Sequence, residues 1–171
     1  NGKRAVVLNI DRWLRDEVNR GEGVMGRYKT DEFSKLLAVI SKRFGPFFLD
    51  LPVYDKLKQR AITGIGGDEI RPKDIVIVEG TIALLFAEGV EGRKSHKWFV
   101  EIDENEQIER VLREYRLRGC SENDARSIFF NRQQDEIPVV LASAERASIK
   151  ITLNIGSVSP PEVQHMKKNI S

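Results

Sequence analysis

The stretch IVIVEGTIALLFA, residues 75–87, decides the fold because its residue pattern changes in the middle. Residues 75–78 form an uninterrupted apolar and β-branched run, which is typical of a strand that is buried on both faces. Glu79 and Gly80 follow, and residues 81–87 then favour a short apolar helix. A buried strand that leads directly into a helix predicts an α/β fold with a parallel sheet flanked by helices.

The same alternation of strands and helices extends in both directions along the chain. Buried strands are expected at 4–10, 47–54 (ending near Pro52), 97–102 and 149–155. Amphipathic helices are expected at 30–44, 104–119 and from Ser121 onward, with Thr30 and Ser121 as N-caps and Gly45 and Gly119 as stops. The glycine-containing stretch 12–29 predicts a loop or a short helix plus loop, and the stretch 61–74 predicts a loop or a pair of short edge strands.

Composition limits the classes of protein to which the chain can belong. Of its 171 residues, 40% are hydrophobic and 32% are charged, which is enough for one core and excludes wholesale disorder. The net charge of +2 gives no sign of a nucleic-acid partner. A lone cysteine, Cys120, and the absence of an apolar run near ~20 residues favour a cytoplasmic protein with no membrane partner. We expect one domain over residues 1–155 and a polar tail over 156–171, with homo-oligomerisation left open.

Two acidic residues stand where predicted strands end. Asp11 follows the strand at 4–10, and Glu79 follows the strand at 75–78. Because ligands of open α/β sheets bind at the carboxyl ends of strands, Asp11 is a candidate to take a proton from a hydroxyl or to hold a metal. Glu79 is a candidate to bind Mg²⁺ directly or through water. The alternative for each is a helix N-cap, which for Asp11 would begin a helix over 12–19.

The helix predicted at 104–119 carries a series of arginines, namely Arg110, Arg113, Arg116 and Arg118. Arginine clusters bind phosphate oxygens and stabilise the charge that develops in phosphoryl transfer. The alternative is a solvated helix face on which Glu106, Glu109 and Glu114 serve as ion-pair partners. Other chemical motifs are missing, since the sequence contains no GxxxxGK[ST], GxGxxG, CxxC or HExxH. The histidines, His96 and His165, are far apart in sequence and lack metal-ligand spacing.

Taken in order, these segments resemble the uridine kinase and phosphoribulokinase family of P-loop kinases. The resemblance runs from about residue 4 to residue 155. It rests on the strand ending in Asp-Arg-Trp, RYKTDEF (27–33), LPVYD (51–55), VIVEGTIALL (76–85) and FVEIDENEQIERVLREYRLRG (99–119). It implies a three-layer P-loop NTPase fold and transfer of the γ-phosphate of ATP, with Mg²⁺, to a hydroxyl of a nucleoside, a sugar phosphate or a related small molecule.

The resemblance also implies roles for individual residues. Asp11 looks like the catalytic base, and both Asp11 and Glu79 match positions near Mg²⁺. Arg113 matches a catalytic arginine of a helical lid over residues 104–132 that closes over ATP. The implied nucleotide-binding residues are Arg110, Arg116 and Arg118. The implied acceptor-binding residues are Arg27, Tyr28, Tyr54, Asp55 and Arg60.

The first strand, phosphate loop and helix of that family have no counterpart in this sequence. The one Gly-Lys pair, Gly2-Lys3, precedes a predicted strand rather than a helix. We expect the natural protein to carry this segment ahead of Asn1, and its loss to leave apolar surface on neighbouring strands. The alternative is a non-catalytic kinase-like module that binds a nucleotide or a protein. Because KLKQR, residues 56–60, replaces the histidine region of uridine kinases, the acceptor stays open.

Overall fold

The computed structural model describes residues 3–56, 58–90, 94–153 and 162–166. Their contacts divide the chain into two compact units, residues 1–95 and 96–171. The boundary therefore falls inside the single domain expected over residues 1–155. None of the helices described is both long enough and apolar enough to cross a membrane.

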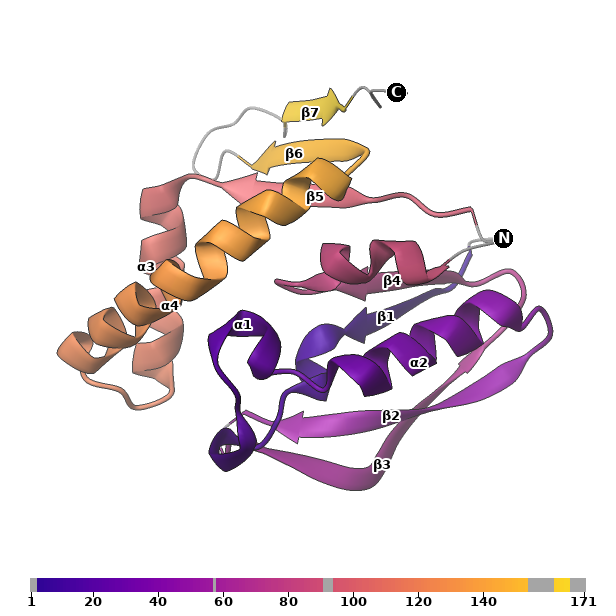
Figure 1. The fold of residues 1–171 in the computed structure, drawn as a ribbon, viewed down its shortest axis with the longest axis horizontal. Helices are drawn as coiled ribbons and strands as arrows, with labels where there is room; N and C mark the ends of the chain where they lie inside the picture. The colour runs from indigo at the N-terminus through magenta and orange to yellow at the C-terminus, as the bar shows by residue number, and fades with distance from the viewer. Residues whose placement is uncertain (1–2, 57, 91–93, 154–161, 167–171) are drawn as a thin grey trace. The chain divides into compact units, whose positions relative to one another are not determined.

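The first unit contains a parallel strand pair and an antiparallel hairpin (Figure 1). Strand β1 (Ala5–Asn9) pairs in parallel with β4 (Ile75–Glu79), so that Asn9 lies opposite Glu79 where both strands end. Strands β2 (Phe47–Asp55) and β3 (Arg60–Ile70) form the hairpin. The parallel pair confirms the predicted parallel pairing, while the hairpin adds antiparallel pairing that the sequence analysis did not include.

The hairpin corrects two expectations about strands. Residues 60–70 form one long strand rather than a loop or a pair of short strands. Pro52 does not end β2, which continues to Asp55. The register shifts between Leu51 and Val53, and this irregularity lets β2 continue through Pro52, which has no N–H to donate to β3.

Helix α2 (Thr30–Lys42) presents the predicted apolar face to the core of this unit. Phe33 is fully buried, and its ring centroid lies 4.9 Å from that of Trp13 and 5.1 Å from that of Phe86. Lys29, not Thr30, is the N-cap, and its side chain makes no capping hydrogen bond. The helix expected at 81–87 is the 3-10 helix η3 (Ala83–Val90). Between β1 and α2 the chain forms three short helices, η1 (Ile10–Trp13), η2 (Glu17–Asn19) and α1 (Gly23–Gly26), where a loop or a single short helix plus loop was expected.

The second unit combines a three-stranded sheet with a helix pair. Strand β5 (Trp98–Ile102) pairs in parallel with β6 (Ile149–Leu153), which pairs antiparallel with β7 (Glu162–His165). Helices α3 (Glu104–Leu117) and α4 (Glu122–Ser143) pack through Leu112, Tyr115, Ala125 and Phe129. The 3-10 helix η4 (Ala144–Arg146) follows α4 directly.

The turn between α3 and α4 follows the predicted capping. The Ser121 hydroxyl accepts the N–H of Asp124 at 3.2 Å, as expected of an N-cap. Gly119, directly after the C-cap Arg118, has a φ of +89°, a conformation that glycine adopts without steric cost. The apolar piece at 137–144 is not a separate element, because α4 continues through Pro138 to Ser143.

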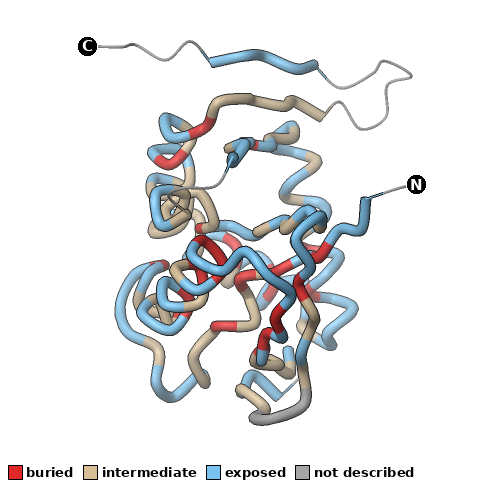
Figure 2. The backbone as a smooth tube through the Cα atoms, turned by 90° about the vertical axis from the view of Figure 1, so that its right-hand side faces the viewer, coloured by how far each residue is buried: buried red, intermediate tan, exposed pale blue. Residues whose placement is uncertain are grey.

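The predicted polar tail is not uniformly irregular. Glu162–His165 form β7, which Figure 2 shows exposed along its length beside the half-buried β6. Residues 154–161 and 167–171, the rest of that tail and the end of the predicted last strand, lie outside the described residues.

Apolar side chains are exposed on strands of both units. On the β1–β4 pair, Val7, Ile75 and Ile77 are 51%, 47% and 44% exposed. On β5, Trp98 and Val100 are 53% and 52% exposed. Within the described ranges, β4 pairs only with β1 and β5 only with β6, so each has one unpaired edge.

Candidate functional site

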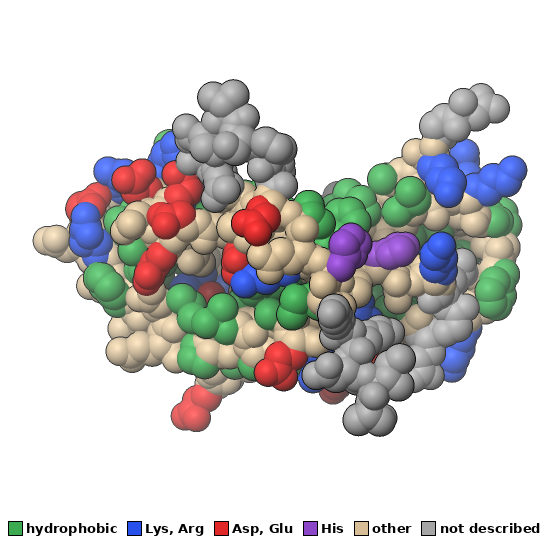
Figure 3. Space-filling model, turned by 90° about the horizontal axis from the view of Figure 1, so that it is seen from above, with side chains coloured by type: hydrophobic (Ala, Val, Ile, Leu, Met, Phe, Trp, Pro, Cys, Tyr) green, Lys and Arg blue, Asp and Glu red, His purple; other side chains and the backbone are tan. Residues whose placement is uncertain are grey.

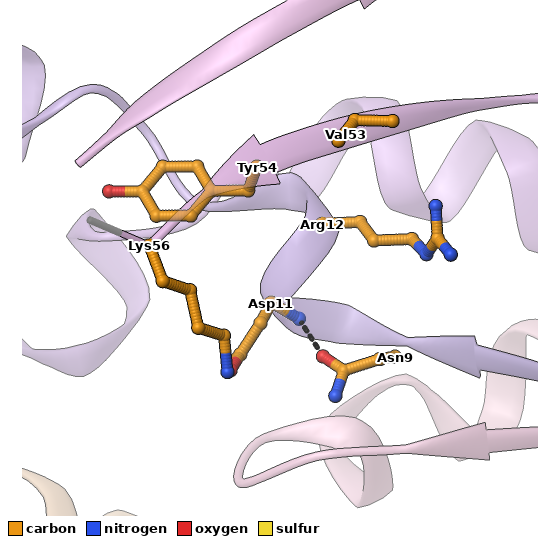
Figure 4. Close-up of a pocket in the computed structure, with 6 residues that line it drawn as sticks. All are labelled: Asn9, Asp11, Arg12, Val53, Tyr54 and Lys56. Carbon is orange, nitrogen blue, oxygen red and sulfur yellow. Dashed lines mark hydrogen bonds and ion pairs between the residues drawn. The ribbon is translucent and has the colours of Figure 1, made fainter. Parts of the chain in front are cut away.

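At the end of β1, the helix N-cap is Asn9 rather than Asp11. Asn9 accepts the backbone N–H of Asp11 through its side-chain Oδ1 at 2.7 Å and is itself the N-cap of η1. The N-cap interpretation of Asp11 is therefore wrong. The Asp11 carboxylate is left to make tertiary contacts, and it points into an open pocket (Figure 4).

Two side chains from distant parts of the sequence meet the Asp11 carboxylate. Lys56, just beyond β2, donates from Nζ to Oδ2 at 3.0 Å. The hydroxyl of buried Tyr28 donates to Oδ1 at 3.3 Å. Tyr28 is held there by the bridge between Leu14 and Tyr28 and by its backbone N–H, which bonds to Met25. The carboxylate is thus fixed by the tertiary fold rather than by its neighbours in sequence.

The pocket around Asp11 has a volume of about 240 Å³. Asn9, Asp11, Arg12, Val53, Tyr54 and Lys56 line it. Figure 4 shows side chains from β2 on one side and from β1 and η1 on the other. Arg12 donates from Nη1 to the carbonyl of Pro52 at 3.2 Å, which ties the two walls together. Behind Tyr54, Arg20 donates from Nη2 to the phenolic oxygen at 2.6 Å.

Glu79 is the last residue of β4 and lies opposite Asn9, the last residue of β1. Its carboxylate is exposed and makes no hydrogen bond or ion pair within the described part of the chain. Because η3 begins only at Ala83, Glu79 is not a helix N-cap. Gly80 follows with a φ of +135°, and a Cβ there would lie 2.3 Å from Cγ2 of the buried Ile10. Gly80 is therefore required where β1 and β4 end together.

The predicted acceptor-binding residues separate into two groups. Tyr54 lines the pocket and Tyr28 contacts Asp11. Asp55 instead accepts the backbone N–H of Lys58 at 3.0 Å in the turn between β2 and β3. Arg60 is the exposed first residue of β3, and Arg27 bonds through its carbonyl to the N–H of Arg15 at 2.8 Å. None of these last three lines the pocket.

The arginines of α3 belong to the second unit and bond mainly to nearby acids. Arg110 donates to Glu106 at 2.8 Å, Arg118 pairs with Glu114, and Arg116 lies 3.3 Å from Glu122. These contacts fit the solvated-face alternative for three of the four arginines. Arg113 differs, because it is exposed and has no ion-pair or hydrogen-bond partner among the residues described.

The sequence analysis missed four polar residues of the pocket and its wall, namely Asn9, Arg12, Arg20 and Lys56. Lys56 had a usable signal, since residues two apart at a strand end share a side and Tyr54 was already a candidate. Asn9 and Arg12 flank Asp11 in sequence. Nothing local points to Arg20, whose contact with Tyr54 spans 34 residues.

The histidines are closer than their sequence separation indicated. Within the second unit, His165 pairs with Ile149 on β6, and the N–H of Ile149 bonds to the carbonyl of Lys97, next to His96. Figure 3 shows the histidine side chains gathered together on one face. They form no metal centre by themselves, since no group of three or more metal-binding side chains occurs among the described residues.

Comparison with known proteins bears on the fold. No protein-family model matches the chain, and no curated protein matches its sequence. Among solved structures, it is similar to a "putative fructose transport system kinase" from Silicibacter sp. TM1040, with 16% identity over 82% of this chain and 70% of that chain and a TM-score of 0.58. It is also similar to the YGR205w protein, with 16% identity over 96% and 79% of the two chains and a TM-score of 0.61. These likenesses show that the chain shares the α/β fold of these two proteins, and they do not distinguish the uridine kinase family.

Proposed function

We propose that this protein is a phosphotransferase that moves the γ-phosphate of ATP to a hydroxyl of a small molecule, with Asp11 as the base. The observation that carries the proposal is the Asp11 carboxylate, which stands at the end of the β1–β4 pair and opens onto a pocket of about 240 Å³. This is the edge at which open α/β sheets bind ligands. The likeness of the fold to that of a protein named a putative fructose transport system kinase supports the same reaction class.

In the proposed reaction, Asp11 orients the acceptor hydroxyl and takes its proton. The acceptor oxygen forms a bond to the γ-phosphorus while the bond from that phosphorus to the ADP oxygen breaks. Lys56 and Tyr28 hold the two oxygens of Asp11 through the contacts at 3.0 and 3.3 Å. Phosphoryl transfer depends on positioning and charge neutralisation more than on covalent chemistry, and this arrangement suits positioning.

The carboxylates at the strand ends fit a magnesium ion. Mg²⁺ is usually bound by one or two carboxylates together with substrate phosphates. Glu79 has an exposed carboxylate without a partner within the described ranges. Asn9 pairs with Glu79 across the two strands, and Asp11 follows two residues after Asn9. Glu79, with Asp11, would hold the ion, which neutralises phosphate charge when bound.

The remaining roles rest on the resemblance alone. We assign Arg113 to the transferred phosphate, Arg110, Arg116 and Arg118 to the nucleotide, and residues 104–132 to a lid. We also assign Arg27, Asp55 and Arg60 to the acceptor, although they do not line the pocket. Within the described ranges β4 has one unpaired edge and the β1–β4 pair exposes Val7, Ile75 and Ile77, which supports a P-loop strand and helix beside this pair.

The second candidate is a kinase-like module that binds a nucleotide or a protein without chemistry. One observation favours it: the sequence has no GxxxxGK[ST] to hold the phosphates of ATP.

The test is product formation by the full-length protein. It is incubated with MgATP and a panel of nucleosides, sugars, sugar phosphates and hydroxy acids, and phosphorylated products are detected by mass spectrometry. The proposal predicts a phosphorylated product for at least one acceptor class. Binding of ATP with no product from any class favours the second candidate.

A further inference from the structure

We infer that the acceptor carries an oxyanion, a phosphate or a carboxylate, in addition to the hydroxyl that is phosphorylated. This inference rests on the proposed function and names the substrate class for the same pocket. It comes from the side chains that line the pocket. Apart from Asp11, the polar side chains among them have hydrogen-bond donors that their contacts within the protein do not use.

Lys56 is the main anion-binding group. Its ammonium has three hydrogens to donate, and its hydrogen bond to Asp11, at 3.0 Å, uses one of them. Its side chain is 48% exposed against 29% for Asp11, so the ammonium is open to the pocket while the carboxylate is partly covered. In Figure 4 the Lys56 side chain extends from just beyond the end of β2 to the Asp11 carboxylate.

The Tyr54 hydroxyl can donate a hydrogen bond to a ligand because Arg20 already donates to its oxygen. Its phenolic oxygen accepts a hydrogen bond from Arg20 at 2.6 Å. A hydroxyl that already accepts in this way keeps its own hydrogen for a further partner. Because Tyr54 lines the pocket, that hydrogen is available to a ligand oxygen.

Asn9 and Arg12 add donors on the opposite wall. The Asn9 carbonyl oxygen is occupied by the N–H of Asp11, which leaves the side-chain NH₂ as the uncommitted part of the amide. Arg12 uses one nitrogen for the Pro52 carbonyl at 3.2 Å, and its guanidinium has further N–H groups. The lining thus carries the charges of Arg12 and Lys56 against that of Asp11, a net charge of +1.

Two anionic ligands could accept hydrogen bonds from these donors, namely the acceptor and ATP. The pocket's size favours the acceptor, because about 240 Å³ lies below the roughly 300–1,000 Å³ of pockets for drug-sized ligands and suits a small hydroxy compound. The donors also surround the carboxylate that faces the acceptor hydroxyl. An uncharged polyol would leave the two cations without an anionic partner beyond Asp11.

The experiment measures binding to the full chain by calorimetry in the absence of nucleotide. The probes are two matched pairs, ribose with ribose 5-phosphate and glycerol with glycerate. The charged member of at least one pair is expected to bind about tenfold or more tightly, since a hydrogen bond to a charged group is stronger than one between neutral groups. Lys56→Met should remove most of that preference, and Lys56→Arg should keep it. Lys58→Met removes an exposed lysine outside the pocket and should change nothing.

Equal binding of the charged and neutral members, no binding of either pair, or an unchanged preference in Lys56→Met would overturn the inference. A second arm uses a non-hydrolysable ATP analogue. If Lys56→Met weakens the analogue and leaves ribose 5-phosphate and glycerate binding intact, the donors serve the nucleotide and the inference fails. Charge-selective binding without product formation would refute the proposed function alone, whereas transfer to neutral acceptors only would refute the inference alone.

Discussion

The Asp11 pocket and the arginine helix α3 hold their charged groups in different ways. Asp11 is positioned by Tyr28 and Lys56, which are 17 and 45 residues away in sequence. Arg110 and Arg118 are positioned by acids four residues away on the same helix. The pocket therefore exists only when the first unit is folded, whereas the arginine pairs need little more than a helix. A charge fixed by distant contacts is the stronger sign of a functional site.

The largest effect on stability is expected at Gly80, where β1 and β4 end together. Gly80→Ala places a methyl group 2.3 Å from Cγ2 of Ile10, at a φ of +135°, and Ile10 has no room to move because it is fully buried. We expect a loss of about 1–3 kcal/mol in the free energy of unfolding. Chemical denaturation of the full chain measures it.

Gly45→Ala is the matched control, because a Cβ at Gly45 meets nothing within 4 Å. It should change stability by less than about 0.5 kcal/mol. Equal effects of the two substitutions would show that the end of β4 is not closely packed against Ile10.

A smaller effect on turnover is expected in α3. Arg113→Ala should lower kcat about tenfold, because this arginine is free to meet a phosphate, and removing one such group costs at least that much in comparable sites. Arg110→Ala, which removes a residue paired with Glu106 at 2.8 Å, should lower kcat less. Steady-state kinetics and thermal unfolding of both variants provide the comparison. If Arg113→Ala reduces stability as much as turnover, Arg113 is structural.

The smallest effect concerns acid stability in the second unit. The hydrogen bond from Lys150, at 2.9 Å, together with that from Thr152 lowers the pKa of Glu101, while burial opposes the shift. A lowered pKa in the folded state stabilises the protein above the unfolded-state pKa, and this contribution is lost as the pH falls through the folded-state pKa. Glu101→Gln should therefore reduce the loss of stability between pH 6 and pH 3, by less than about 1 kcal/mol.

Denaturation midpoints across that pH range measure the effect. Glu109→Gln is the control, since Glu109 is exposed and has no partner in the described ranges. A steeper acid limb in Glu101→Gln than in the parent protein would contradict the sign of the shift.

The sequence predicted those features that depend on local pattern. The apolar runs located β1, β4 and β5, and Ser121 capped α4 as expected. The β2–β3 hairpin was missed because Pro52 reads as a strand end, whereas a register shift accommodates it. Lys56 and Arg20 were missed because their partners, Asp11 and Tyr54, are 45 and 34 residues away. Contacts of that kind follow from the packing of whole elements, which a residue pattern does not specify.

The most direct test of the central claim is the rate of product formation by Asp11→Asn with the acceptor that the wild-type protein phosphorylates. Asparagine keeps the shape of the side chain and removes its ability to take a proton, so the rate should fall at least about 100-fold while stability changes little. Asp31→Asn, at an exposed acid in the first turn of α2, should keep the wild-type rate. A rate for Asp11→Asn within twofold of wild type would contradict the account.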